Sequence, residues 1–301
     1  MTNHQESLFQ RFLTPIFRLL IDGDALERVY ESVDWPSAVD RLVRPNFTYP
    51  TYYEGQNFHG IQGGYLNPRA AVFYDPITQY VLPPNEPLVR QGLISVIQGT
   101  PRRVLDLGCG TGTMTLMLKR AFPEAEVIGL DLSPYMLTVA EMKAKQANLT
   151  IQFIHGNAEH SGFPSGSCDL VTAALLFHET PTPIAQAILA EAYRLLTVGG
   201  EVAILDGNQQ TLRQTEWLNH VFEEPYIEAY AKSNVDAWLR TAGFGAVQTQ
   251  DHWWVHQLSH GVKGLSVHRK QSARARSTSG RSDSGWEDPN GIPAPTFGVV
   301  S

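Results

Sequence analysis

Residues 104–115 read VLDLGCGTGTMT, a short apolar run that ends in an acid and leads directly into a glycine-rich loop. The run has the length and composition of a buried strand, and the residues from Thr113 onward begin a helical pattern of apolar side chains. Glycines at positions 108, 110 and 112 permit a tight turn and let a ligand approach the backbone closely. The stretch therefore predicts a strand, a ligand-binding loop and a helix in direct succession.

A second acid, Asp131, stands nineteen residues after Gly112, at the end of another apolar run. A carboxylate in this position can accept hydrogen bonds from both hydroxyl groups of a ribose. The glycine spacing is G-x-G-x-G, and Thr113 occupies the place of the third glycine in a dinucleotide-binding loop, which weakens the case for NAD. Glycine-rich turns also occur in folds that bind nothing there, but the element order and Asp131 together favour a nucleoside-containing ligand.

Strands and helices alternate along the rest of the chain. Further strands are expected over 126–132, 150–156, 168–177, 201–207, 246–251 and 253–258, and helices over 113–122, 134–144, 183–196 and 235–242. The helix over 183–196 is expected to end at Gly199–Gly200. This alternation is typical of an α/β fold with a doubly wound, mostly parallel sheet, whose ligands bind at the carboxyl ends of the strands.

Composition divides the chain into three parts: an N-terminal helical cap or lid over 1–98, a ligand-binding domain over 99–260, and a tail over 261–301. The tail is rich in Ser, Arg, Gly and Pro without hydrophobic periodicity, so we expect it to be disordered. Within the cap, residues 8–21 predict an amphipathic helix that is too short and too charged to span a membrane or act as a signal. Binding of this helix to a membrane surface is a less favoured alternative.

Charge and cysteine usage limit the possible functions. The net charge is −7, and the tail is basic, so the remaining residues form a strongly acidic body that argues against a nucleic-acid partner. Cys109 and Cys168 are the two cysteines, and they lack the spacing of metal ligands. We therefore expect reduced thiols, a cytoplasmic location and no metal site.

Four motifs in order carry a specific resemblance: VLDLGCGTG (104–112), VIGLDLSPYML (127–137), FIHGNAEHSGFPSGSCDLVTAALLFHE (153–179) and YRLLTVGGEVAILD (193–206). With them, the chain from about residue 70 to 258 resembles the class I S-adenosylmethionine-dependent methyltransferases, the type that includes ubiquinone/menaquinone and many small-molecule methyltransferases. The resemblance implies a Rossmann-like sheet of seven strands with the last strand antiparallel, S-adenosyl-L-methionine as cofactor, and a small molecule as methyl acceptor.

By position, the resemblance also assigns a set of cofactor-binding residues: Asp106, Gly108, Cys109, Gly110, Asp131, Leu132, Asn157 and Ala158. It places Asp131 at the ribose, Leu132 against the adenine, and the backbone N–H of Ala158 toward the adenine ring. Asn157 departs from the family pattern, which commonly has aspartate there. Its amide oxygen can still accept a hydrogen bond from the adenine amino group.

His178 and Tyr74 are the candidate catalytic residues. Methyl transfer from a sulfonium requires mainly alignment, and a general base only when the acceptor is an alcohol or phenol. His178 is the preferred base, although a packing role beneath the cofactor is an equally open interpretation. Tyr74 belongs to the aromatic stretch 57–75, which the resemblance places over the cofactor as a lid with a hinge at Gly63–Gly64. The candidate lid residues are Phe58, His59, Tyr65, Tyr74 and Tyr80.

Several alternatives stay open at this point. His252 and His256 are interpreted as ordinary sheet residues, and the aromatic residues of 222–230 as acceptor-pocket wall or as core. The acceptor is expected to be neutral or apolar, but neither the methylated atom nor the oligomeric state follows from the sequence. The competing functions are an NAD-type oxidoreductase and a non-catalytic methyltransferase-like binding protein.

Overall fold

The computed structural model describes residues 21–61, 63–82, 84–215 and 224–265. The predicted helix over 8–21 and the predicted tail from residue 266 onward lie outside these residues. All described residues belong to one compact unit that ends at Leu265. No helix in the described part of the chain combines the length and the apolar character needed to cross a bilayer.

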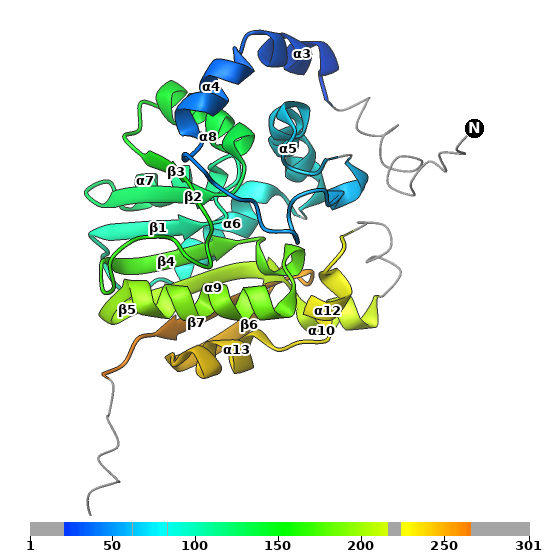
Figure 1. The fold of residues 1–301 in the computed structure, drawn as a ribbon. Helices are drawn as coiled ribbons and strands as arrows, with labels where there is room; N and C mark the ends of the chain where they lie inside the picture. The colour runs from blue at the N-terminus through cyan, green and yellow to red at the C-terminus, as the bar shows by residue number, and fades with distance from the viewer. Residues whose placement is uncertain (1–20, 62, 83, 216–223, 266–301) are drawn as a thin grey trace, which may run out of the picture. The chain divides into compact units, whose positions relative to one another are not determined.

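Seven strands of the described chain form one sheet in the order β3-β2-β1-β4-β5-β7-β6 (Figure 1). Strand β7 runs antiparallel to β5 and β6, while the pairs among β1 to β5 are parallel. This arrangement confirms the predicted doubly wound sheet with its antiparallel last strand. The strands are β1 Arg103–Leu107, β2 Glu126–Asp131, β3 Gln152–His155, β4 Cys168–Ala174, β5 Leu196–Gly207, β6 Gly245–His252 and β7 His256–Val262.

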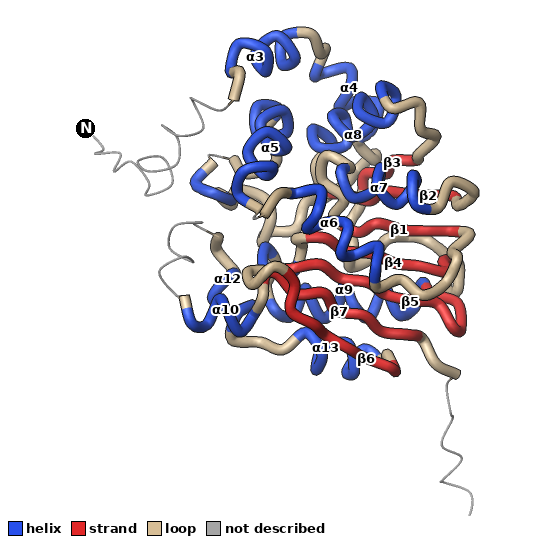
Figure 2. Tube along the Cα trace, turned by 180° about the vertical axis from the view of Figure 1, so that it is seen from behind, coloured by secondary structure: helices blue, strands red, loops and turns tan. Residues whose placement is uncertain are grey.

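Helices cover both faces of the sheet because side chains of successive strand residues point to opposite faces. Val104 of β1 packs with the residues of α6 and α7 on one face, and Leu105 packs with α9 and α13 on the other. Figure 1 shows the face covered by α9 and α13, and Figure 2 shows the opposite face. The helices concerned are α6 Glu86–Ser95, α7 Thr113–Ala121, α8 Pro134–Gln146, α9 Thr182–Leu195 and α13 Val235–Ala242.

The start of α8 shows how local sequence fixes an element next to the site. Ser133 caps the helix, since its hydroxyl oxygen accepts a hydrogen bond from the backbone N–H of Met136. Pro134 occupies the first turn, where its missing N–H costs nothing. Both features place the N-terminus of α8 directly after Asp131 of β2.

The N-terminal part of the chain packs beside α8. Helices α4 and α5 contact α8, and α3 contacts α5, so that these elements form a cap next to the sheet (Figure 1). The aromatic stretch 57–75 contains the short helix η1, a turn and the first half of α5. The elements are α3 Gly23–Glu31, α4 Trp35–Leu42, η1 Phe58–Gly60 and α5 Pro68–Val81.

Two predicted boundaries are wrong. Helix α9 ends at Leu195 and β5 begins at Leu196, so the pair Gly199–Gly200 lies within the strand and not at the helix end. The strand expected over 253–258 is shifted, because Trp253 and Trp254 have positive φ angles of 50° and 60° and form the turn between β6 and β7. Strand β7 therefore begins at His256 and runs to Val262.

Candidate functional site

The glycine loop and Asp131 meet at the carboxyl edge of the sheet. The backbone N–H groups of Gly110 and Ser133 each donate a hydrogen bond of 2.8 Å to the Asp131 carboxylate. Gly110 has a φ of 52°, and nothing lies within 4 Å of the place where a Cβ atom would stand. The loop thus leaves open space over its backbone beside an acid, which is a geometry suited to a ribose-containing ligand.

A first cavity, here called the cofactor cavity, lies over this loop. Seven of the eight predicted cofactor-binding residues line it: Asp106, Gly108, Cys109, Gly110, Asp131, Leu132 and Ala158. Asn157 is the exception. Its amide oxygen accepts a hydrogen bond from Glu159 N, and its amide nitrogen donates to Glu159 Oε1. The side chain of Asn157 therefore closes a local turn, and the structure does not place it in the cavity wall.

Burial controls the ionisation of Asp131. Loss of solvation, opposed by the N–H groups of Ser133 and Gly110, raises the pKa of Asp131 from its ordinary value of 3.8 to about 6. Because the pKa in the folded state is raised, the contribution of this group to stability declines as the pH rises from about 4 to about 6. The ionised carboxylate is thus a cost to the fold at a position that faces the cavity.

Two further residues line this cavity that the sequence pattern did not predict. Arg90 of α6 is the one Lys or Arg side chain among the described residues of the cofactor cavity, and its Nε donates to Glu86 Oε1 at 2.7 Å. Tyr53 lies in the segment before η1 and also lines the cavity. No local motif marks either residue, because helix and loop positions ahead of β1 carry no characteristic spacing.

Helix α5 is fixed over the glycine loop by Asp75. The hydroxyl groups of Thr111 and Thr113 donate hydrogen bonds to Asp75 Oδ1, and Lys143 of α8 forms an ion pair with the same carboxylate. Tyr74, the neighbour of Asp75 along the helix, therefore lies at the edge of the cofactor cavity.

Four of the five predicted lid residues, Phe58, His59, Tyr65 and Tyr74, form a group of contacting rings around Tyr65. Phe58 stacks on Tyr65 with 5.1 Å between ring centroids, and Tyr74 meets Tyr65 edge-on at 5.8 Å. Tyr80 stands apart from this group, since it is 46% exposed and lines neither cavity. Phe58, His59, Tyr65 and Tyr74 thus line one or both cavities, whereas Tyr80 lies on the surface, and the lid role of the stretch stays a prediction.

A second cavity of about 580 Å³, here called the acceptor cavity, adjoins the first. Its wall is mostly apolar and includes Phe73 and Ile77 of α5, Ile227 of α12 (Ile227–Ala231) and Trp254. The two cavities share four wall residues: Tyr65, Tyr74, Leu175 and Glu179. A ligand in one cavity would therefore come next to a ligand in the other.

Of the aromatic residues in 222–230, the described ones belong to the packed scaffold. Tyr230 is buried, and its hydroxyl donates to Gly207 O at 2.8 Å. The hydroxyl of Tyr226 donates to Tyr52 O at 2.9 Å. Ile227 and Glu224 supply the wall of the acceptor cavity from this segment instead, and Phe222 lies outside the described residues.

His178 faces the acceptor cavity from the short helix η2 (Phe177–Glu179) that follows β4. Its Nδ1 lies 2.6 Å from Asp206 Oδ1, and Asp206 is held in turn by the N–H groups of Phe177 and Gly207. Burial alone would lower the pKa of His178, but the carboxylates of Asp206 and Glu179 outweigh it and raise that pKa to about 9. In this state the ring carries its proton near neutral pH and offers an acceptor a hydrogen-bond donor.

His256 has a larger role in the cavity wall than its interpretation as an ordinary sheet residue suggested. It begins β7 and lines the acceptor cavity, and its buried Nδ1 has no hydrogen-bond partner among the described residues. Burial lowers the pKa of His256 to about 4, so the ring is neutral and can bond to a ligand. No sequence pattern indicates this role, because the wall position of His256 depends on the Trp253–Trp254 turn.

Comparisons with known proteins agree with this geometry. Residues 104–200 match the family model described as a methyltransferase domain. The demethylmenaquinone methyltransferase of Listeria welshimeri is 38% identical over 176 residues, which cover 58% of this chain and 68% of that protein. The enzyme of the same name from Thermus thermophilus is 38% identical over 117 residues, which cover 39% of this chain and 52% of that protein.

The chain thus spans between about half and two thirds of the length of these curated relatives. A solved S-adenosylmethionine-dependent methyltransferase from Aquifex aeolicus has the same fold, with a TM-score of 0.51 and 18% identity over 65% of this chain and 98% of that one. Motifs, sheet topology and relatives agree, and the chain belongs to the class I S-adenosylmethionine-dependent methyltransferases.

Proposed function

We propose that the protein transfers a methyl group from S-adenosylmethionine to a small, largely apolar acceptor held in the acceptor cavity. The observation that carries this proposal is the shared wall of the two cavities at Tyr65, Tyr74, Leu175 and Glu179. A methyl donor in one cavity and an acceptor in the other would meet at this wall, as an in-line displacement requires.

The residues of the cofactor cavity fit S-adenosylmethionine. The Asp131 carboxylate can accept hydrogen bonds from the ribose hydroxyls, and the open backbone at Gly110 admits a ligand close to the loop. Arg90 supplies a cation suited to the carboxylate of the methionine part. Leu132 and Ala158 offer the apolar surface that an adenine ring needs.

When bound, the cofactor supplies an electrophilic methyl group, and the residues of the chain supply orientation and exclusion of water. Phe58 stacks on Tyr65, and Tyr74 meets Tyr65 edge-on, so these packed rings would limit the access of water where the two cavities adjoin. His178, with its ring fixed by Asp206, lies where an oxygen of the acceptor would come. It orients that oxygen by a hydrogen bond, and it acts as the base only after its own proton has left.

Cofactor entry requires movement of the lid. The volume of the cofactor cavity is about 80 Å³, below the roughly 300–1,000 Å³ of most ligand pockets. We infer that the segment 57–75 acts as a lid held down on the loop by Asp75, whose contacts with Thr111 and Lys143 would open for the ligand to enter.

The cavity wall and the relatives support one class of acceptor. The relatives with 38% identity are named demethylmenaquinone methyltransferases, and the wall of the acceptor cavity is mostly apolar but also includes polar side chains such as His178, Glu179 and His256. An acceptor with an aromatic ring and hydroxyl groups, such as a reduced quinone, is consistent with the relatives' names and with the cavity wall. The buried free cysteines support a reducing, cytoplasmic location. The two relatives described above are named methyltransferases, which does not favour the NAD-type alternative.

The Asp131 contact is tested by cofactor binding. Asp131→Asn should weaken binding of S-adenosylmethionine by about 10- to 100-fold, because a hydrogen bond to a charged acceptor contributes about 1.5–3 kcal/mol. For the wild type, affinity should fall as the pH drops through about 6, where the carboxylate takes up its proton. Isothermal titration calorimetry between pH 5 and 8 measures both effects. Glu124→Gln, which changes the same charge at an exposed position, is the control. A flat pH profile and unchanged affinity in Asp131→Asn would contradict the assignment.

The activity is tested with methyl-labelled S-adenosylmethionine and a panel of acceptors: a reduced naphthoquinone, a simple phenol, an amine and a carboxylic acid. We expect label in the hydroxylated aromatic products, most in the naphthoquinol, and none with Asp131→Asn at limiting cofactor. Tight cofactor binding without transfer to any of these, or to any component of a cell extract, would instead identify a binding protein.

His178→Ala should lower turnover by about 100-fold or more, the usual loss when a positioned acid–base group is removed. The affinity for S-adenosylmethionine should be preserved, because His178 lines the acceptor cavity and not the cofactor cavity. Steady-state kinetics and calorimetry on this variant, with the exposed His160→Ala as control, separate the two effects. Unchanged turnover would remove His178 from the mechanism.

A further inference from the structure

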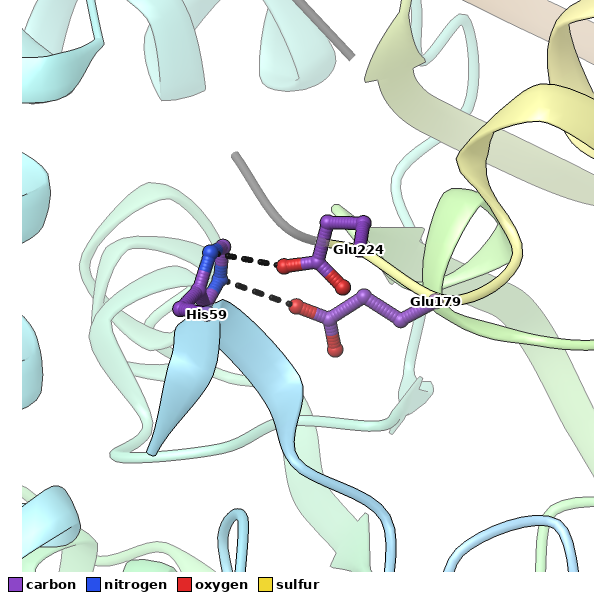
Figure 3. Close-up of side chains that lie close together, drawn as sticks. All are labelled: His59, Glu179 and Glu224. Carbon is purple, nitrogen blue, oxygen red and sulfur yellow. Dashed lines mark ion pairs between the residues drawn. The ribbon is translucent and has the colours of Figure 1, made fainter. Parts of the chain in front are cut away.

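Three metal-ligating side chains from distant parts of the chain converge at the acceptor cavity. Figure 3 shows the His59 imidazole facing the carboxylates of Glu179 and Glu224. One ligand atom of each residue lies within 4.8 Å of the other two. His59 Nδ1 is 2.7 Å from Glu224 Oε1, and His59 Nε2 is 3.6 Å from Glu179 Oε1. All three residues line the acceptor cavity.

Glu224 is the most buried residue of this cluster, and its carboxylate has few partners that would compensate its charge. Its side chain is 1% exposed, and apart from the 2.7 Å contact of Oε1 with His59 Nδ1 its two buried carboxylate oxygens have no partner in the described part of the chain. A buried carboxylate in this condition is costly unless a cation compensates it. The close approach of His59 supplies one positive charge at most, and Glu179 adds a second carboxylate to the same space.

We propose that His59, Glu179 and Glu224 bind a divalent cation of the Mn²⁺ type. One imidazole nitrogen and two carboxylate oxygens form a donor set that suits Mn²⁺, and two carboxylates balance its charge. The hydroxyl of Tyr65 donates to Glu179 Oε1 at 2.6 Å and so fixes the orientation of this ligand from outside the cluster. With three protein ligands, the cation keeps coordination positions for water or for a ligand in the cavity.

The position of the cluster indicates what the cation does. Glu179 belongs to the wall shared by the two cavities, so the cation lies beside the place where donor and acceptor meet. Resting on the proposed function, the cation would bind a hydroxyl oxygen of an aromatic acceptor and lower the pKa of that hydroxyl. The released proton would pass to solvent. The cation thus selects acceptors that carry a ring hydroxyl near the methylated atom.

The sequence predicted no metal site because the three ligands are separated by 120 and 45 residues. Motif spacing detects ligands that share one helix or loop, whereas this set comes from η1, η2 and the segment before α12. His59 reaches the cluster through a left-handed backbone conformation with φ 51°, an uncommon state for a residue other than glycine. Strained backbone of this kind often occurs at functional sites.

The test is a titration of the full-length, chelator-treated protein with Mn²⁺, followed by electron paramagnetic resonance of the free ion, without cofactor or acceptor. We expect one bound Mn²⁺ per chain, displaced by Zn²⁺, and at least a tenfold loss of affinity in Glu224→Gln and in His59→Gln. Glu228→Gln, which removes an exposed carboxylate from α12, should bind as the wild type does. Calorimetric binding of S-adenosylmethionine to each variant checks that it is folded.

The proposal is overturned if the wild type binds neither Mn²⁺ nor Zn²⁺, or if Glu224→Gln binds Mn²⁺ as tightly as the wild type while retaining cofactor binding. In the first case His59 would be an imidazolium that merely pairs with the two carboxylates. Because the readout is the free metal ion, failure of this site is distinguishable from failure of methyl transfer, which the labelled-cofactor assay measures.

Discussion

The contacts of Asp75 determine how the lid meets the rest of the site. The Asp75 carboxylate accepts hydrogen bonds from the hydroxyl groups of Thr111 in the glycine loop and Thr113 at the start of α7. It also forms an ion pair with Lys143 of α8. Because Asp75 lies in α5, these contacts fix the helix that carries Tyr74 and lines both cavities. The ion pair is about one quarter exposed, so solvent screens it and its loss costs little. The network is thus suited to hold a lid that must also open.

Two features at the carboxyl edge of the sheet lower the stability of the folded state. Asp131 is ionised there against the cost of burial, and Leu175 adopts a φ of 62° at the end of β4 although it is not glycine. Such a backbone conformation costs roughly 1–3 kcal/mol and persists only where its surroundings impose it. Leu175 lies in the wall shared by the two cavities. The strained backbone of Leu175 therefore lies at the wall where the methyl donor and the acceptor are proposed to meet.

The sheet and most of the cofactor cavity could be predicted from the sequence because their determinants are local. The loop Gly108–Gly112, the acid that ends β2 and the Ser133 cap are each encoded within a few residues. The family resemblance then gave the roles of these positions. Asn157 did not follow the assignment, since its amide bonds to Glu159 two residues later. A short polar side chain in a turn commonly satisfies its own backbone in this way.

The acceptor cavity could be predicted only in part because its wall joins segments far apart in the chain. The sequence proposed the stretch 57–75 and His178 as candidates, and both supply wall residues, but Asp206, Glu224 and His256 acquire their positions from tertiary packing. The Trp253–Trp254 turn shifted β7 and brought His256 to the cavity, and no periodic pattern reports a positive φ at two tryptophans. The His59 cluster likewise has no signature in spacing.

The central claim is that two cavities meet at one wall so that a donor in the first faces an acceptor in the second. A crystal structure of the protein with S-adenosylhomocysteine tests this most directly. We predict that the ribose hydroxyls lie within hydrogen-bonding distance of Asp131 and that the sulfur lies at the wall formed by Tyr65, Tyr74, Leu175 and Glu179. A ligand whose ribose lies away from Asp131, or whose sulfur points away from the acceptor cavity, would contradict the account.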